Sequence, residues 1–85
     1  MFMENVGALI RNRREKLGLK VFELAKKVGV SAVYITQIEK HNKLPPYDLF
    51  MKIEGILGRD SDIYIPYLKA KYPEILKDMK DRNIK

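Results

Sequence analysis

The chain has 85 residues, 46% of them hydrophobic, and a formal net charge of +6. This length predicts one compact domain with a thin stability margin, because a domain of this size buries little more than about 60% of its unfolded surface. The absence of cysteine excludes disulfide bonds and thiolate metal sites, and it argues against a small secreted protein held together by disulfides.

The first predicted helix spans Glu4–Leu17. Glu4 or Asn5 stands near its start, and Gly18 is the kind of residue that ends a helix in the left-handed conformation. The core-facing side of this helix is marked by residues that recur at intervals of three and four, namely Val6, Leu9, Ile10, Arg13, Arg14 and Leu17.

A short second helix is predicted over Val21–Val28, with Gly29 as its end. Its apolar residues are Phe22, Leu24, Ala25 and Val28. Ser31 is a good N-cap for a third helix over Ser31–Lys40, because its hydroxyl can accept a hydrogen bond from a free backbone N–H. In that helix we expect Tyr34, Ile35 and Ile38 to face the core, which leaves Ala32, Val33, Thr36, Gln37 and Lys40 outside.

A loop over His41–Pro46 separates the third helix from a fourth, predicted over Tyr47–Leu57 and ended by Gly58. The apolar stripe of the fourth helix is Leu49, Phe50, Ile53 and Leu57.

After this helix, Asp60–Asp62 is expected to form a turn or a helix cap. The tail predicts one helix near Pro66–Lys71, with the proline in its first turn, and another near Pro73–Arg82. Its apolar side is expected to hold Ile65, Leu68, Tyr72, Ile75, Leu76 and Met79. The fold class is therefore all-α, a compact bundle of about five to six short helices.

The two short helices joined by a tight turn at Gly29 are typical of a helix-turn-helix, in which the second helix enters the DNA major groove. The sequence resembles the Cro/repressor-type (XRE-like) helix-turn-helix proteins over about Val6–Gly58. The residues that carry the resemblance are Ile10, Arg14, Gly18, Leu19, Leu24, Ala25, Val28, Gly29, Val30, Ser31, Tyr34, Ile35, Ile38, Glu39, Pro45, Lys52, Ile53, Leu57 and Gly58. The resemblance implies a lambda-repressor-like DNA-binding domain over residues 1–59. Residues 60–85 have no clear equivalent in the family, and we expect them to form a C-terminal helical extension that completes the core, makes a dimer contact or does both, with Tyr64, Tyr67 and Leu68 nearest to the dimer contact.

The resemblance also implies roles for particular residues. Arg14 and Glu39 match a structural salt bridge of the family, and a buried guanidinium needs a carboxylate partner in any case. The base-reading positions fall on Ala32, Val33, Thr36 and Gln37. The residues expected to contact DNA phosphates are Lys20, Ser31, Lys40, His41, Asn42 and Lys43.

Four positions depart from the family pattern. Ala32 and Val33 cannot hydrogen-bond to bases through their side chains, which favours packing against thymine methyl groups and reading of DNA shape. Val21 stands where relatives commonly carry a glutamine that touches phosphate, and Lys20 offers a phosphate contact in its place. His41 stands where relatives usually have glycine, so either His41 or Asn42 must adopt the left-handed backbone conformation.

The charge is concentrated in the first half of the chain, since residues 1–44 carry nine basic and four acidic residues, a net charge of +5. A positive charge concentrated in one half of the chain favours a polyanionic partner such as double-stranded DNA. The leading hypothesis is a homodimeric, repressor-type transcriptional regulator that reads a roughly palindromic operator.

The alternative hypothesis is a protein-interaction module on the same scaffold, for example an antitoxin-like subunit, because a fold does not determine a function. The apolar Val21, Ala32 and Val33 are what a face that no longer reads DNA would carry. Binding to an anionic membrane through the first helix is disfavoured, because the apolar side of that helix is needed for the core.

The sequence lacks the residue patterns that several other classes of protein require. No basic stretch followed by an apolar one opens the chain, so no signal peptide is predicted, and the longest apolar run, Ile63–Leu68, is far short of the roughly 20 residues that cross a bilayer. With one histidine and two serines, no nucleophile–base set can be assembled. We therefore expect a cytoplasmic protein that is not an enzyme, with no metal site, no cofactor and no small-molecule ligand.

Overall fold

The computed structural model describes residues 5–59 and 61–74, and these residues form five α-helices and no strand. The helices are α1 (Val6–Lys16), α2 (Val21–Val28), α3 (Ala32–Lys40), α4 (Tyr47–Leu57) and α5 (Ser61–Lys71). The all-α class is confirmed, and the predicted ranges of the second and fourth helices are confirmed to the residue.

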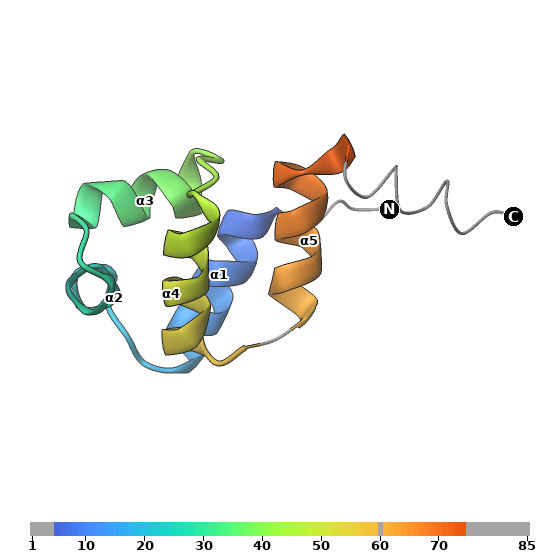
Figure 1. The fold of residues 1–85 in the computed structure, drawn as a ribbon. Coiled ribbons are helices and arrows are strands. Elements are labelled where there is room, and N and C mark those ends of the chain that lie inside the picture. The colour runs from blue at the N-terminus through green and yellow to red at the C-terminus, as the bar shows by residue number, and fades with distance from the viewer. Residues whose placement is uncertain (1–4, 60, 75–85) are drawn as a thin grey trace, which may run out of the picture.

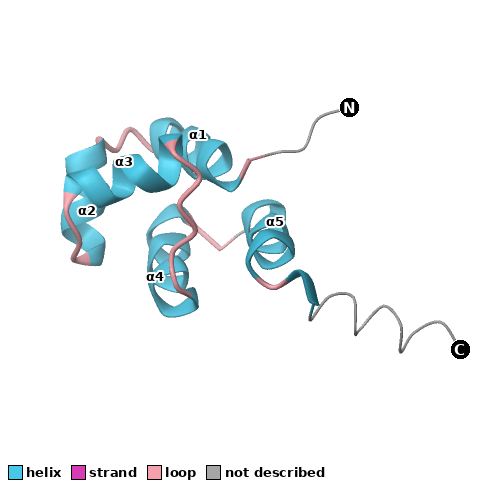
Figure 2. Ribbon diagram, turned by 90° about the horizontal axis from the view of Figure 1, so that it is seen from above, coloured by secondary structure: helices cyan, strands magenta, loops and turns pink. Residues whose placement is uncertain are grey.

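The helices surround one core. Figure 1 shows α2 and α3 at one end of the molecule and α5 at the other, and Figure 2 shows α1 and α4 on opposite sides between them. The core is built from buried apolar residues of all five helices, namely Val6, Ile10, Leu24, Ala25, Val28, Ile35, Ile38, Phe50, Ile53, Leu57, Ile63 and Tyr67. No helix of the described residues is long and apolar enough to cross a membrane.

Side-chain caps set the starts of three helices. The Oδ1 atom of Asn5 accepts hydrogen bonds from the backbone N–H groups of Gly7 and Ala8, at 2.7 and 3.3 Å. At α2, the Glu23 carboxylate accepts from the backbone N–H of Lys20 at 2.7 Å. At α3, the Ser31 hydroxyl accepts from the N–H of Tyr34 at 3.1 Å. The first-turn N–H groups have no partner inside a helix, so these contacts determine where each helix begins.

The tail departs from the prediction. Helix α5 begins at Ser61 and Pro66 lies in its interior, although the sequence predicted a helix that starts near Pro66. An interior proline removes the hydrogen bond to the carbonyl four residues earlier and costs about 3 kcal/mol. Burial of Ile63 and Tyr67, both at most 2% exposed, offsets that local cost. The other predicted tail helix, near 73–82, lies mostly outside the described residues.

Two apolar residues expected on the core-facing side of their helices, Leu17 and Ile65, are exposed instead, as is Phe22 of α2. Phe22 is 54% exposed and Ile65 42%. Each lies two positions from a buried residue of the same helix, and two positions rotate the side chain by about 200° to the opposite side. Leu17, 51% exposed, is the C-cap residue that follows the last residue of α1.

Tyr67, a residue of the C-terminal extension that was expected near a dimer contact, lies in the core. The side chain is fully buried, and its ring stacks on that of Phe50 with centroids 3.8 Å apart and planes 4° from parallel. Its hydroxyl donates a hydrogen bond to the carbonyl oxygen of Pro45. Tyr67 therefore belongs to the core that joins α5 to α4.

Candidate nucleic-acid interface

The α2–α3 pair has a tight turn between its helices. Gly29 ends α2 with φ = 83°, in the left-handed region that side chains other than glycine rarely adopt. The backbone N–H groups of Gly29 and Val30 both donate to the carbonyl of Ala25, at 2.8 and 3.0 Å. Ser31 then caps α3 at once, so three residues carry the chain from one helix to the next.

Helix α3 has one buried side and one accessible side. Ile35 and Ile38 are each 1% exposed and lie in the core. The four predicted base-reading residues occupy the other side, where Ala32 and Val33 are exposed and Thr36 and Gln37 are half-buried. Their spacing of one, four and five positions puts them on one face of the helix. That face offers one hydroxyl, one carboxamide and two apolar side chains.

Arg14 and Glu39 form a buried pair that joins α1 to the last turn of α3. The Nε and Nη2 atoms of Arg14 donate to the two carboxylate oxygens of Glu39, at 2.7 and 3.0 Å. Nη1 of the same guanidinium donates to the carbonyl of Leu19 at 2.6 Å. The hydrogen bond to Glu39 raises the pKa of Arg14 against the opposing effect of burial. Both side chains are almost fully buried, so neither presents its charge to a ligand.

The loop after α3 is folded back onto that helix. The backbone N–H groups of His41 and Lys43 both donate to the carbonyl of Gln37, at 3.0 and 3.2 Å. Asn42, not His41, adopts the left-handed conformation, with φ = 58°, and its Oδ1 accepts a hydrogen bond from Nδ2 of Asn5. The Lys43 ammonium lies over the Tyr34 ring, 5.2 Å from its centroid, within the range of a cation–π interaction.

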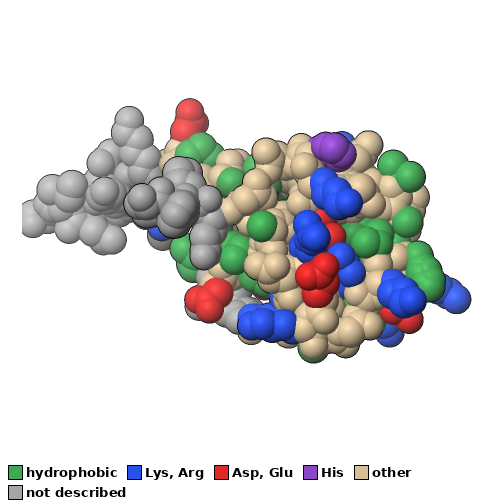
Figure 3. Space-filling model, turned by 180° about the vertical axis from the view of Figure 1, so that it is seen from behind, with side chains coloured by type: hydrophobic (Ala, Val, Ile, Leu, Met, Phe, Trp, Pro, Cys, Tyr) green, Lys and Arg blue, Asp and Glu red, His purple; other side chains and the backbone are tan. Residues whose placement is uncertain are grey.

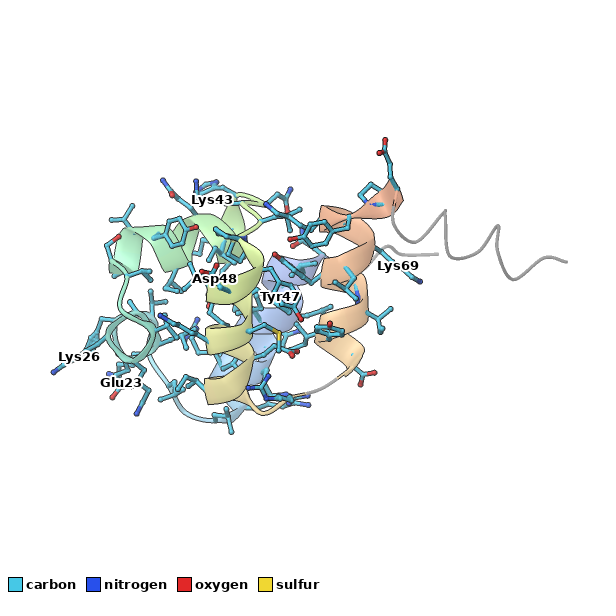
Figure 4. The ribbon with its side chains drawn as sticks, in the orientation of Figure 1. Glu23, Lys26, Lys43, Tyr47, Asp48 and Lys69 are labelled. Carbon is cyan, nitrogen blue, oxygen red and sulfur yellow. The ribbon has the colours of Figure 1, made fainter. Side chains whose placement is uncertain are left out.

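All six residues expected to contact phosphates are exposed, namely Lys20, Ser31, Lys40, His41, Asn42 and Lys43. They lie around the ends of α3, apart from Lys20, which stands at the start of α2 beside the Glu23 carboxylate. Figure 4 shows Lys43 close to the end of α3 where α4 begins, whereas Glu23 and Lys26 project from α2. Figure 3 shows that most of the basic side chains visible from behind lie over the half formed by α1, α2 and α3.

Two residues that contact this loop were missed by the sequence analysis. Tyr67 and Lys71 of α5 donate to the carbonyls of Pro45 and Leu44. These partners lie 22 and 27 positions apart, and no local pattern relates residues at such a distance. Within the part of the chain that the structure describes, no group of three histidine, aspartate or glutamate residues could hold a metal ion.

Comparison with known proteins agrees with the helix-turn-helix geometry of α2 and α3. The model of a family described as Helix-turn-helix matches residues 10–63. The chain is 42% identical over 59 residues to an uncharacterized HTH-type transcriptional regulator of Methanothermobacter thermautotrophicus, an alignment that covers 67% of this chain and 86% of the relative. It is 32% identical over 60 residues to the ImmF control region 10 kDa protein of Bacillus phage phi105, covering 71% and 67% respectively. No solved structure matches the chain.

Proposed function

The chain belongs to the helix-turn-helix family, and from this premise we propose that it is a sequence-specific, DNA-binding transcriptional regulator of the repressor type. The observation that carries the proposal is the accessible face of α3, from Ala32 to Gln37, held on a buried base of Ile35 and Ile38. One relative is named a transcriptional regulator and another a control-region protein, which supports a regulatory role rather than an enzymatic one.

In the proposed mode of binding, α3 enters the major groove and α2 crosses the phosphate backbone. Gln37 is the main base-reading residue, because a carboxamide can pair with both N6 and N7 of adenine. Thr36 donates or accepts one further hydrogen bond. Ala32 and Val33 pack against thymine methyl groups, and Val33, at 66% exposed, has the apolar surface for this contact.

The phosphate contacts come from the residues around the ends of α3. Lys40, His41, Asn42 and Lys43 supply them at one end, with Lys20 at the start of α2. The Ser31 hydroxyl accepts the N–H of Tyr34, and its own proton stays available for a phosphate oxygen. Such contacts set the position of the protein on DNA without reading sequence.

Two copies bind as a cytoplasmic homodimer in this proposal. Their α3 helices then lie about one turn of DNA, roughly 34 Å, apart on a palindromic site. We assign the dimer contact to the C-terminal extension, residues 60–85. Ile65 supports this assignment, because this large apolar side chain of α5 is 42% exposed and lies outside the core.

The test of this function is to select bound duplexes from a random DNA pool. The affinity of the protein for the most enriched duplex is then measured by anisotropy titration at several salt concentrations. An enriched palindromic motif is expected, with an affinity whose salt slope is about 0.9 for each phosphate neutralised. A steep slope without a motif would restrict the protein to the DNA backbone. No binding at low salt would overturn the proposal and direct attention to a protein partner.

Replacing Gln37 with alanine is expected to reduce discrimination at a single base pair. The loss should be about 1–3 kcal/mol, the value of one bidentate contact to adenine. The measurement is competition between the selected duplex and variants changed at each position in turn. If the variant protein discriminates at every position as the wild type does, Gln37 does not read a base.

Replacing Lys43 with alanine is expected to weaken binding to all duplexes by the same factor and to lower the salt slope by about 0.9, since a phosphate contact carries no sequence information. Lys52→Ala is the matched control, because Lys52 is an exposed lysine of α4 to which no contact with DNA is assigned. A loss that depended on the sequence of the duplex would contradict the assignment of Lys43 to a phosphate.

A further inference from the structure

The loop between α3 and α4 is held by side chains that come from outside the helix-turn-helix. The hydroxyl of Tyr67 donates to the carbonyl of Pro45, and the ammonium of Lys71 approaches the carbonyl of Leu44 at 3.5 Å. Both donors belong to α5. The other half of the loop is tied to α1 through Asn5 and Asn42. The proposed phosphate contacts at Asn42 and Lys43 therefore stand on backbone whose two ends are anchored to α1 and α5.

The Tyr67 anchor is a rigid one. The ring is stacked on Phe50 and meets the edge of Tyr72 with centroids 6.3 Å apart and planes at 80°. Burial raises the pKa of the hydroxyl well above its ordinary value, so this group stays a neutral donor. Its acceptor is equally constrained, because Pro45 is buried and Pro46, with φ = −60°, follows it. The hydrogen bond thus joins two parts that have little freedom to move.

We propose that Tyr67 is a positioning residue for DNA binding, whose hydroxyl fixes the carbonyl of Pro45 and thereby the phosphate-contacting residues Asn42 and Lys43. The inference rests on the proposed function. A loop that is ordered before it meets DNA avoids the entropy loss of becoming ordered on binding. A loosened loop loses affinity for every duplex alike, because its contacts are to phosphates.

Tyr64 provides a matched control on the same helix. Its ring belongs to the same aromatic cluster, with its centroid 6.3 Å from that of Phe50. The contact of its hydroxyl is with the hydroxyl of Tyr47, the first residue of α4, at 3.1 Å. Figure 4 shows Tyr47 between α4 and α5, away from Lys43. Tyr64→Phe and Tyr67→Phe thus each remove one hydroxyl from one cluster, and only the second removes a bond to the loop.

The experiment compares wild type, Tyr67→Phe and Tyr64→Phe at a temperature well below the melting temperature of each. Binding is measured by anisotropy on two fluorescein-labelled duplexes, the one selected from the random pool and a shuffled duplex of the same composition. Amide hydrogen exchange is measured in the absence of DNA at His41 and Lys43, whose N–H groups bond to Gln37. The second measurement reports on the loop itself and does not depend on DNA binding.

Tyr67→Phe is expected to weaken binding to both duplexes by a common factor of about tenfold, to leave the salt slope unchanged because the same phosphates are contacted, and to accelerate exchange at the two amides. Tyr64→Phe should match wild type in all three. If wild type binds and the two variants behave alike, Tyr67 is only structural and the inference is overturned. A loss confined to the selected duplex also overturns it, because the loop would then contribute to base reading. If wild type binds neither duplex, it is the proposed function that fails.

Discussion

Replacing Glu39 with glutamine is expected to lower the free energy of unfolding by about 3–5 kcal/mol, the usual cost of removing one partner from a buried ion pair. The two side chains have nearly the same size, so packing is preserved. The amide nitrogen of glutamine would face an N–H group of Arg14, and the guanidinium would keep its charge in a site where its side chain is only 9% exposed. A loss of this size is a large part of the total stability of a small domain.

The measurement is urea unfolding followed by circular dichroism. Glu15→Gln is the control, because Glu15 is 53% exposed and pairs with Arg11 at 3.3 Å on the surface of α1, where an ion pair contributes about 1 kcal/mol or less. Replacing Arg14 and Glu39 together with methionine should recover much of the stability, since no buried charge is then left without a partner. Equal costs for Glu39→Gln and Glu15→Gln would show that the buried pair has no structural role.

Replacing Gly7 with alanine is expected to destabilise the fold by about 2 kcal/mol or more, near the upper end of overpacking effects. A Cβ atom at this position would lie 2.2 Å from the carbonyl oxygen of Ile38 and 2.8 Å from that of Glu39. Both oxygens belong to the backbone at the end of α3, which cannot move aside as a flexible side chain can. Helix α1 would have to withdraw from α3, and this shift would disturb the Arg14–Glu39 pair as well.

Gly55→Ala is the matched control for this substitution. Gly55 lies inside α4 and is exposed, and an added Cβ would meet only Nη2 of Arg59, at 3.7 Å. Alanine in place of glycine in a helix interior stabilises by about 0.5–1 kcal/mol. The two substitutions should therefore shift the unfolding midpoint in opposite directions. A Gly7→Ala protein as stable as wild type would mean that the close approach of α1 to α3 does not contribute to stability.

Much of the fold can be predicted from short-range patterns. The ends of α2, α3 and α4 follow from Gly29, Ser31 and Gly58, because caps and left-handed residues act within one turn of the helix that they end or begin. The buried side of α3 follows from the spacing of Ile35 and Ile38. The pairing of Arg14 with Glu39, 25 positions apart, follows only from the resemblance to a family, since no periodicity connects two such distant residues.

In the candidate interface, too, some features follow from short-range patterns and others depend on contacts between distant residues. The face of α3 that carries Gln37 could be assigned in advance, because it is the side of the helix that its own apolar residues leave free. The anchoring of the next loop could not, because Asn5 is the N-cap that precedes α1 and Tyr67 lies in α5. The choice between His41 and Asn42 for the left-handed conformation also depended on that anchoring, since the side chain of Asn42 bonds to Asn5.

By itself, the sequence of this protein determined the helix class, the caps, the Gly29 turn and the residues offered by α3, because each of these depends on interactions within a few positions. Only the tertiary structure decided that α5 runs through Pro66 and that Tyr67 lies in the core against Phe50. In each case burial against a distant helix outweighed a local preference. The free energy of such burial depends on which partner is present, and a linear pattern does not record the partner.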